Sequence, residues 1–225
     1  MSKIELCIVE PDTNEHRQGI VESVLKSSLN LAFGSLEFWA DGNGKPRLRL
    51  TGGPEIFYSF SHARNVEQRF GIAAISLAMA VGIDVELWPL GQADPDFLLA
   101  IATKEDDAAL SILNLSKRDS GIALWVIKEA ALKCTGKVMI DPRCLAVTYE
   151  SNGIFLVRSS AIAGAPNPDV RVRLLVLRRS HLPDVRLILG ISMSAGCDAG
   201  MIIETSLCSA NQRWQFEDFA TAQLL

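Results

Sequence analysis

The first part of the chain has the hydrophobic pattern of short β-strands around one amphipathic helix. Arg47–Leu50 alternates polar and apolar residues with a period of two, which is typical of a half-buried strand. In His16–Leu29, the apolar Ile20, Val24 and Leu25 recur at helical spacing among the charged Arg17, Glu22 and Lys26, which predicts a helix. The cluster Asp41–Pro46 predicts a turn, because glycine and asparagine tolerate positive φ and proline ends strand pairing. The predicted strands of this part are Ile4–Val9, Arg47–Leu50, Ile56–Phe60, Gly71–Ser76 and Val81–Glu86.

The middle of the chain is predicted to be helical, and the remainder is again rich in β-strands. Helix formers dominate Asp96–Leu115 and Arg118–Cys134, and Gly136 is expected to end the second helix. Glycine and proline in Ala161–Asp169 predict a loop. Further strands are predicted over Cys144–Glu150, Ile154–Arg158, Arg171–Leu177, Val185–Met193 and Met201–Thr205. This order of elements predicts an αβ block, a helical middle and a second β-rich block, with no repeat detectable in the sequence.

Composition and charge narrow the class of protein. The 225 residues are 48% hydrophobic and 21% charged, which is enough apolar material for a packed core and excludes disorder as the main state. The net charge of −4 predicts no nucleic-acid partner. The apolar run Phe70–Ile83 is shorter than the roughly 20 residues of a membrane span, and the acidic Glu5 interrupts any secretory leader. We therefore expect a cytoplasmic protein with no membrane partner.

Several familiar site motifs are absent. Pro46 follows Gly44 and Lys45 where a phosphate-binding loop needs serine or threonine, and no GxSxG, HExxH or GxGxxG is present. The five cysteines are scattered without a CxxC, which argues against a zinc site or a disulfide framework.

The segment Val81–Glu86 carries the first candidate chemistry. A strand there would place Asp84 and Glu86 on one face and Ile83 on the other. Two neighbouring carboxylates repel each other unless a cation lies between them, and Mg²⁺ accepts such hard oxygen ligands. The alternative is that Glu86 ends the strand in solvent while Asp84 forms a cap or a salt bridge.

A second candidate lies on the predicted helix 118–134. Trp125, Glu129 and Lys133 are spaced four residues apart and therefore share one helix stripe. Apolar residues cover the opposite side, so the helix is apolar nearly all round, which predicts burial and means that Glu129 and Lys133 need partners. The alternative is a simple exposed Glu–Lys pair on the helix surface.

Ser61 and His62 form the third candidate, at the end of the predicted strand Ile56–Phe60. A hydroxyl and an imidazole at that position can donate hydrogen bonds to phosphate oxygens. The alternative is a turn serine beside an exposed histidine.

Taken together, the segments GKP (residues 44–46), YSFSH with its preceding Phe57 (57–62), GIDVE (82–86) and WVIKEAALK (125–133) resemble the 4′-phosphopantetheinyl transferases. The resemblance is to the long, single-chain, pseudo-dimeric type. It implies an α+β fold with two similar αβ halves, each with a small antiparallel sheet packed on a long helix. The halves would span residues 1–103 and 104–225, with the active site at their interface.

The resemblance also implies roles for individual residues. Asp84, Glu86 and Glu129 would hold Mg²⁺, and Glu129 and Lys133 would be the catalytic residues. The side chains that would bind coenzyme A are Arg17, Lys45, Ser61, His62, Lys128 and Lys133. One departure is the segment Ala102–Asp106, which lacks the aromatic residue often found there in the family and leaves open whether Glu105 or Asp106 contributes.

The activity implied is transfer of 4′-phosphopantetheine from coenzyme A to a serine of an apo acyl carrier protein or peptidyl carrier domain. The reaction would require Mg²⁺ and release 3′,5′-adenosine bisphosphate, and the single-chain type implies a monomer. Two alternatives remain: a non-catalytic protein that binds coenzyme A or a carrier protein, and another magnesium-dependent phosphotransferase.

Overall fold

The computed structural model describes residues 3–9, 14–29, 36–42, 44–53, 55–64, 69–88, 96–137, 140–159, 169–179, 182–194, 202–205 and 214–218. The chain is a mixed α+β protein, as predicted. The elements of its first part are β1 (Lys3–Val9), α1 (Asn14–Leu29), β2 (Leu36–Ala40), β3 (Pro46–Leu50), β4 (Glu55–Arg64), β5 (Arg69–Ser76) and β6 (Val81–Trp88). The helical middle contains α2 (Phe97–Ile101), the 3₁₀ turn η1 (Lys104–Asp106), α3 (Asp107–Leu113) and α4 (Lys117–Thr135). A second 3₁₀ turn, η2 (Pro142–Cys144), is followed by β7 (Leu145–Ser151), β8 (Ile154–Ser159), β9 (Val170–Arg179), β10 (Leu182–Ser194), β11 (Ile202–Thr205) and β12 (Trp214–Asp218).

Within the described part of the chain, the strands form two sheets of six strands each. Five strands of the first sheet lie in the order β1-β5-β4-β3-β2, and five strands of the second lie in the order β6-β10-β9-β8-β7. The two orders are the same when each set is numbered from its own first strand, and all these neighbours are antiparallel. β11 joins the first sheet in parallel beside β1, and β12 pairs with β9 in the second sheet.

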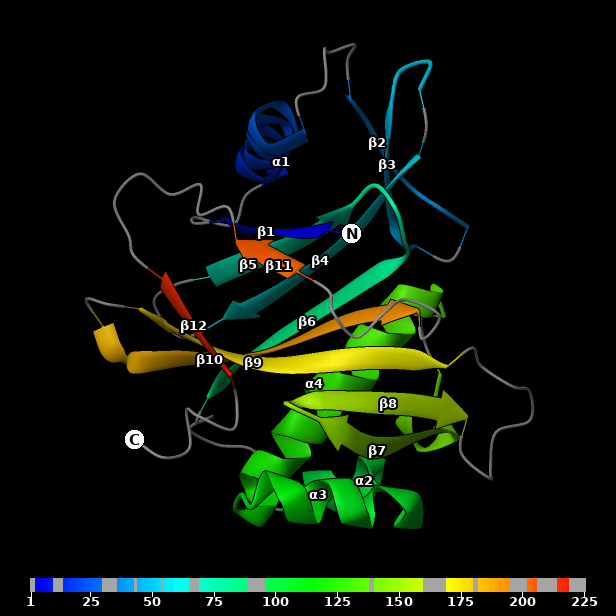
Figure 1. The fold of residues 1–225 in the computed structure, drawn as a ribbon, viewed down its shortest axis with the longest axis vertical. Helices are drawn as coiled ribbons and strands as arrows, with labels where there is room; N and C mark the ends of the chain where they lie inside the picture. Colours follow the sequence, from blue (N-terminus) through cyan, green and yellow to red (C-terminus); the bar gives the residue numbers. More distant parts are fainter. Residues whose placement is uncertain are drawn as a thin grey trace.

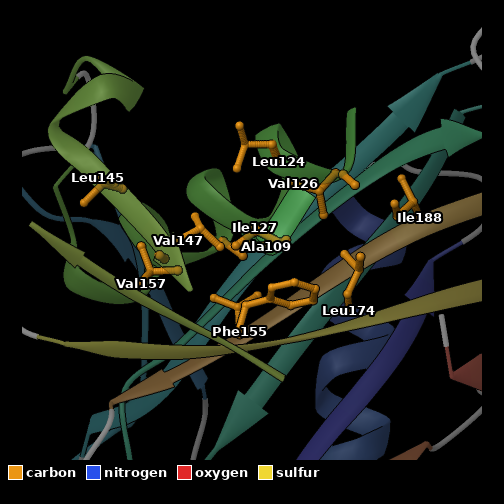
Figure 2. Close-up of a cluster of buried hydrophobic side chains, with 14 of the residues drawn as sticks. Ala109, Leu124, Val126, Ile127, Leu145, Val147, Phe155, Val157, Leu174 and Ile188 are labelled. Carbon is orange, nitrogen blue, oxygen red and sulfur yellow. The ribbon is translucent and has the colours of Figure 1, made fainter. Parts of the chain in front are cut away.

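The sheets pack face to face, with α1 on the outer face of the first and α4 on the outer face of the second (Figure 1). Alternate residues explain this layering, since successive strand side chains point to opposite faces. Ile83 and Val85 of β6 are buried between the sheets together with Leu6 of β1. A second cluster, shown in Figure 2, lies beneath α4 and includes Ile127 from the helix and Phe155 from β8.

The helix α4 confirms the prediction of a buried helix that ends at Gly136. The Ser116 hydroxyl accepts a hydrogen bond from the Asp119 backbone N–H at its start, and Gly136 adopts the left-handed conformation at its end with φ of 72°. By contrast, the helix predicted over Asp96–Leu115 is divided into α2, η1 and α3. The backbone is extended at Ala102 and Thr103, which breaks the helix and directs Asp106 into the interior.

Strand boundaries differ from the prediction at one place that matters for the site. β4 continues to Arg64, so Ser61 and His62 lie within a strand and not after its end. The short strands β2 and β12 were not predicted, and the predicted loop at residues 161–168 lies outside the described residues. No helix in the described ranges is long and apolar enough to cross a membrane.

Candidate functional site

A cavity of about 560 Å³ opens where α1, β3 and β4 approach β6 and α4. Its volume lies within the range usual for ligand pockets. The lining combines aromatic, cationic and acidic side chains: Arg17, Pro46, Phe60, Ser61, His62, Asp84, Glu86, Trp125, Glu129 and Lys133. Seven of the nine residues singled out from the sequence therefore line one pocket, and Lys45 and Lys128 do not.

Close packing of α4 on β6 brings these groups together. A Cβ atom at Gly82 would clash with the carbonyl oxygen of Ala130 and the backbone nitrogen of Cys134, so only glycine permits this approach. The neighbouring strand β10 contributes a second small residue, Gly190, where a Cβ would lie 2.9 Å from Val126. The Ser192 hydroxyl of β10 donates to the Ala130 carbonyl at 2.6 Å and fixes the helix on the sheet.

Asp84 is the most buried of the three carboxylates and has a protein partner. Its side chain is 6% exposed, and the Lys133 ammonium donates to its Oδ1 at 2.6 Å. The Ser61 hydroxyl donates to the same oxygen at 2.9 Å and accepts from Lys133 at 3.1 Å. The alternative given for Asp84, a salt bridge, is therefore found in the structure, because Lys133 forms an ion pair with it.

Glu86 and Glu129 line the cavity together with Asp84, and the three carboxylates are called the acidic wall below. Burial, and then the nearby Asp84 and Glu129 carboxylates, raise the pKa of Glu86 to about 7, while Lys133 and a hydrogen bond from the Trp125 side chain oppose the shift. Burial and the Asp84 carboxylate likewise raise the pKa of Glu129. The pKa of Asp84 is also raised by burial, against the opposing effects of Lys133 and Ser61.

The three carboxylates are the type of ligand that a hard divalent cation prefers, but they are not arranged around a common centre. Asp84 Oδ2 is buried and accepts no hydrogen bond, and all three groups offer the oxygen ligands that Mg²⁺ prefers. Among the residues whose positions are described, no three His, Cys, Asp or Glu side chains are close enough to hold one metal ion together. Coordination of one magnesium ion by all three carboxylates would therefore require side-chain movement.

Arg17 and His62 bring hydrogen-bond donors to another part of the cavity lining. The Arg17 guanidinium, from α1, stacks on the Phe60 ring at 3.6 Å from its centroid. His62 is exposed two residues further along β4, with its ring 6.4 Å from that of Phe60. Cationic and acidic groups thus line the same cavity, an arrangement that can accommodate a phosphate group together with a cation.

Lys128 does not reach the cavity. Its side chain is 0% exposed, and its ammonium donates to Asp106 Oδ2 at 2.8 Å and to the Ile101 carbonyl at 2.9 Å. Asp106 also accepts hydrogen bonds from the backbone N–H groups of Thr103 and Val147. The expected phosphate contact of Lys128 is therefore replaced by a buried ion pair that joins α4 to η1 and β7.

The sequence left open whether Glu105 or Asp106 contributes to the site, and the structure shows that Asp106 is the one bonded to Lys128. Asp106 is fully buried in this network, whereas Glu105 is exposed, and neither lines the cavity.

Lys45 lies next to the cavity without lining it. Its ammonium donates to the Cys134 carbonyl at 3.0 Å, at the end of α4 where carbonyl groups lack helical partners. Burial lowers the pKa of Lys45. The turn that carries Lys45 is fixed by Asp41, whose carboxylate accepts from the Lys45 backbone N–H at 3.0 Å and from the Arg47 side chain at 2.9 Å.

Two supporting residues were not identified from the sequence. Ser59 accepts a hydrogen bond from the Ile83 backbone N–H at 3.1 Å and so joins β4 to β6, the end strand of the second sheet as described. Gly190 was visible in the sequence only as a glycine within an apolar strand, a pattern that indicates close approach of another backbone.

A comparison with models of known protein families finds a match over the part of the chain that contains β6 and α4. Residues 80–174 match the family model of the 4′-phosphopantetheinyl transferase superfamily. The matched segment is less than half of the chain, and it includes β6 and α4, which carry the acidic wall, Lys133 and Trp125. This match supports a transferase of the phosphopantetheinyl type, a class that uses coenzyme A and carrier proteins. A search of curated protein sequences finds no match.

Proposed function

We propose that the protein transfers 4′-phosphopantetheine from coenzyme A to a serine of an acyl or peptidyl carrier protein, with Mg²⁺ as the required ion. The observation that carries this proposal is that Asp84, Glu86, Glu129 and Lys133 line one cavity together with Ser61 and His62. The family match over β6 and α4 supports it independently.

Each lining group suits one part of that reaction. His62 and Arg17 would bind phosphate groups of coenzyme A, since both line the cavity and can donate hydrogen bonds to a charged phosphate. Ser61 would position Lys133, to which it is already hydrogen bonded. Lys133 would stabilise negative charge on the transferring phosphate.

Glu129 is proposed to accept the proton of the attacking serine hydroxyl. Its raised pKa and its place on the cavity wall suit a general base. Asp84, Glu86 and Glu129 would provide the ligands for Mg²⁺, which when bound supplies charge neutralisation at the pyrophosphate. Lys45 is kept as a proposed coenzyme A contact because it is adjacent to Pro46 of the lining.

We further propose that the chain consists of two similar αβ halves with the active site between them. The support is the matching strand order, in which β1-β5-β4-β3-β2 corresponds to β6-β10-β9-β8-β7. Each set also has one long helix after its first strand, α1 in one and α4 in the other. On this basis we place the division between β5 and β6, at residues 77–80, in preference to residue 103.

The direct test is incubation of the protein with an apo carrier protein, coenzyme A and Mg²⁺, followed by intact-mass measurement of the carrier. A gain of about 340 Da, the mass of a phosphopantetheine group, would support transfer. Binding of coenzyme A or of the carrier without any gain in mass would contradict transfer and favour a non-catalytic binding protein.

A further inference from the structure

Lys133 engages the carboxylate that a divalent cation would need. Its Nζ is 2.6 Å from Asp84 Oδ1 and 3.1 Å from the Ser61 hydroxyl oxygen. The Lys133 side chain is 28% exposed while that of Asp84 is 6% exposed. The ammonium therefore approaches a fixed, buried carboxylate from the cavity side on a flexible four-carbon stem.

We propose that Lys133 is an internal counter-cation that neutralises Asp84 in the metal-free protein and must leave it before a divalent cation binds. This inference rests on the magnesium site of the proposed function and adds how occupation of that site is controlled. It assigns to Lys133 a second position, on Asp84, besides its proposed position on the transferring phosphate.

The metal-free protein needs such a cation. A buried carboxylate is very unfavourable without a positive or hydrogen-bonding partner. Glu86 and Glu129 add to the demand, because each, when ionised, places a negative charge in the same cavity lining as Asp84. Within the described lining of the cavity, Lys133 is the cation bonded to Asp84, and Ser61 is the neutral donor.

Lys133 and a divalent cation cannot both stay on Asp84 without a large electrostatic cost. A cation on Oδ1 would take the place of the ammonium, and a cation on the buried Oδ2 would lie within about 5 Å of it. Repulsion at that distance would either weaken metal binding or displace Lys133 toward the cavity.

A phosphate group in the cavity removes this conflict. It offers Lys133 a new negative partner, so the lysine can leave Asp84 without becoming an unpaired charge. The metal and a phosphate-bearing substrate should consequently bind with positive coupling, and the metal alone should bind weakly. The lysine thus prevents stable occupation of the acidic wall by a divalent cation when no substrate is present.

The test measures Mn²⁺ binding to the intact protein in the absence of coenzyme A, by the loss of the free-ion electron paramagnetic resonance signal. Lys133→Met should bind Mn²⁺ at least about tenfold more tightly than wild type, because the competing charge is gone. Lys133→Arg keeps the charge and should stay within about threefold of wild type. Lys117→Met is the matched control, because it removes an exposed charge at the other end of the same helix and should change nothing.

Asp84→Asn separates this inference from the proposed function. If Asp84→Asn loses Mn²⁺ binding while Lys133→Met binds no more tightly than wild type, the metal site stands and the counter-cation inference is wrong. If Asp84→Asn binds Mn²⁺ as well as wild type, the ion does not use Asp84, and both the metal assignment and this inference are wrong.

Thermal unfolding gives a second readout. Without metal, Lys133→Met should melt at a lower temperature than wild type, and Mn²⁺ should raise its melting temperature more than that of wild type. If Lys133→Met is unfolded without metal, Lys133→Gln, which keeps a donor near Ser61, is measured in its place. Equal metal-induced shifts in wild type and the lysine variant would overturn the inference.

Discussion

Gly82 of β6 lies directly against the carbonyl oxygen of Ala130 in α4, so closely that a Cβ atom at position 82 would overlap it. This contact sets the distance between the strand that carries Asp84 and the helix that carries Lys133. Gly82→Ala should therefore force the helix away from the sheet and lower the free energy of unfolding by about 2–3 kcal/mol. The matched control is Gly19→Ala in α1, where no atom lies within 4 Å of the added methyl group. Chemical denaturation of both proteins checks this, and equal stabilities would show that the close approach is unimportant.

The raised pKa of Glu86 makes the stability of the metal-free protein depend on pH. Its pKa of about 7 in the folded protein exceeds the value of 4.5 for a free glutamate, so folding favours the protonated form. The stability that Glu86 contributes in its protonated form is therefore complete below pH 4.5 and is lost as the pH rises through about 7.

Glu86→Gln should remove this dependence. Relative to wild type, the variant should gain on the order of 1–2 kcal/mol between pH 5 and pH 8, a figure reduced for solvent screening of the partly exposed group. Urea denaturation at several pH values measures the gain, with the exposed Glu105→Gln as control. A constant difference between Glu86→Gln and wild type at all pH values would show that Glu86 is an ordinary surface carboxylate.

The buried pair Lys128–Asp106 should matter for stability and not for substrate binding. Lys128→Met leaves the Asp106 carboxylate buried with only its backbone donors and should cost about 3–5 kcal/mol of unfolding free energy. Protein that remains folded should bind coenzyme A with unchanged affinity, because Lys128 does not line the cavity. Denaturation and calorimetric titration provide the two measurements, with Lys117→Met as control. A normal stability combined with weak coenzyme A binding would restore the phosphate role first expected for Lys128.

His62 should act on substrate binding. His62→Ala should raise KM for coenzyme A by about tenfold, the effect of one lost charge-assisted hydrogen bond, with a smaller change in kcat. Arg64→Ala, on the same strand but outside the cavity lining, should leave both constants unchanged. A loss confined to kcat would contradict a role for His62 at a phosphate remote from the reacting bond.

The local features of the site could be predicted from the sequence because they depend on periodicity alone. A strand period of two placed Asp84 and Glu86 on the face opposite Ile83, and helical spacing placed Trp125, Glu129 and Lys133 on one stripe. The cavity indeed contains Asp84, Glu86, Trp125, Glu129 and Lys133 together.

Partners between distant elements could not be predicted in the same way. The Lys133–Asp84 pair joins a helix and a strand whose residues are 49 positions apart in the sequence. Sequence patterns do not show how close two such elements lie in space. The family resemblance implied a coenzyme A contact for Lys128, which precedes Glu129 in the motif. Successive helical residues point about 100° apart, so Lys128 faces Asp106 and the interior while Glu129 faces the cavity.

The most direct test of the proposed function is the carrier-protein mass assay carried out with Asp84→Ala. The account predicts that wild-type protein adds about 340 Da to the carrier in the presence of coenzyme A and Mg²⁺, and that Asp84→Ala adds none at ordinary Mg²⁺ concentration. Asp107→Ala, which removes an exposed carboxylate at the start of α3, should transfer the group as wild type does. Full transfer by folded Asp84→Ala protein would contradict the assignment of the active site to this cavity.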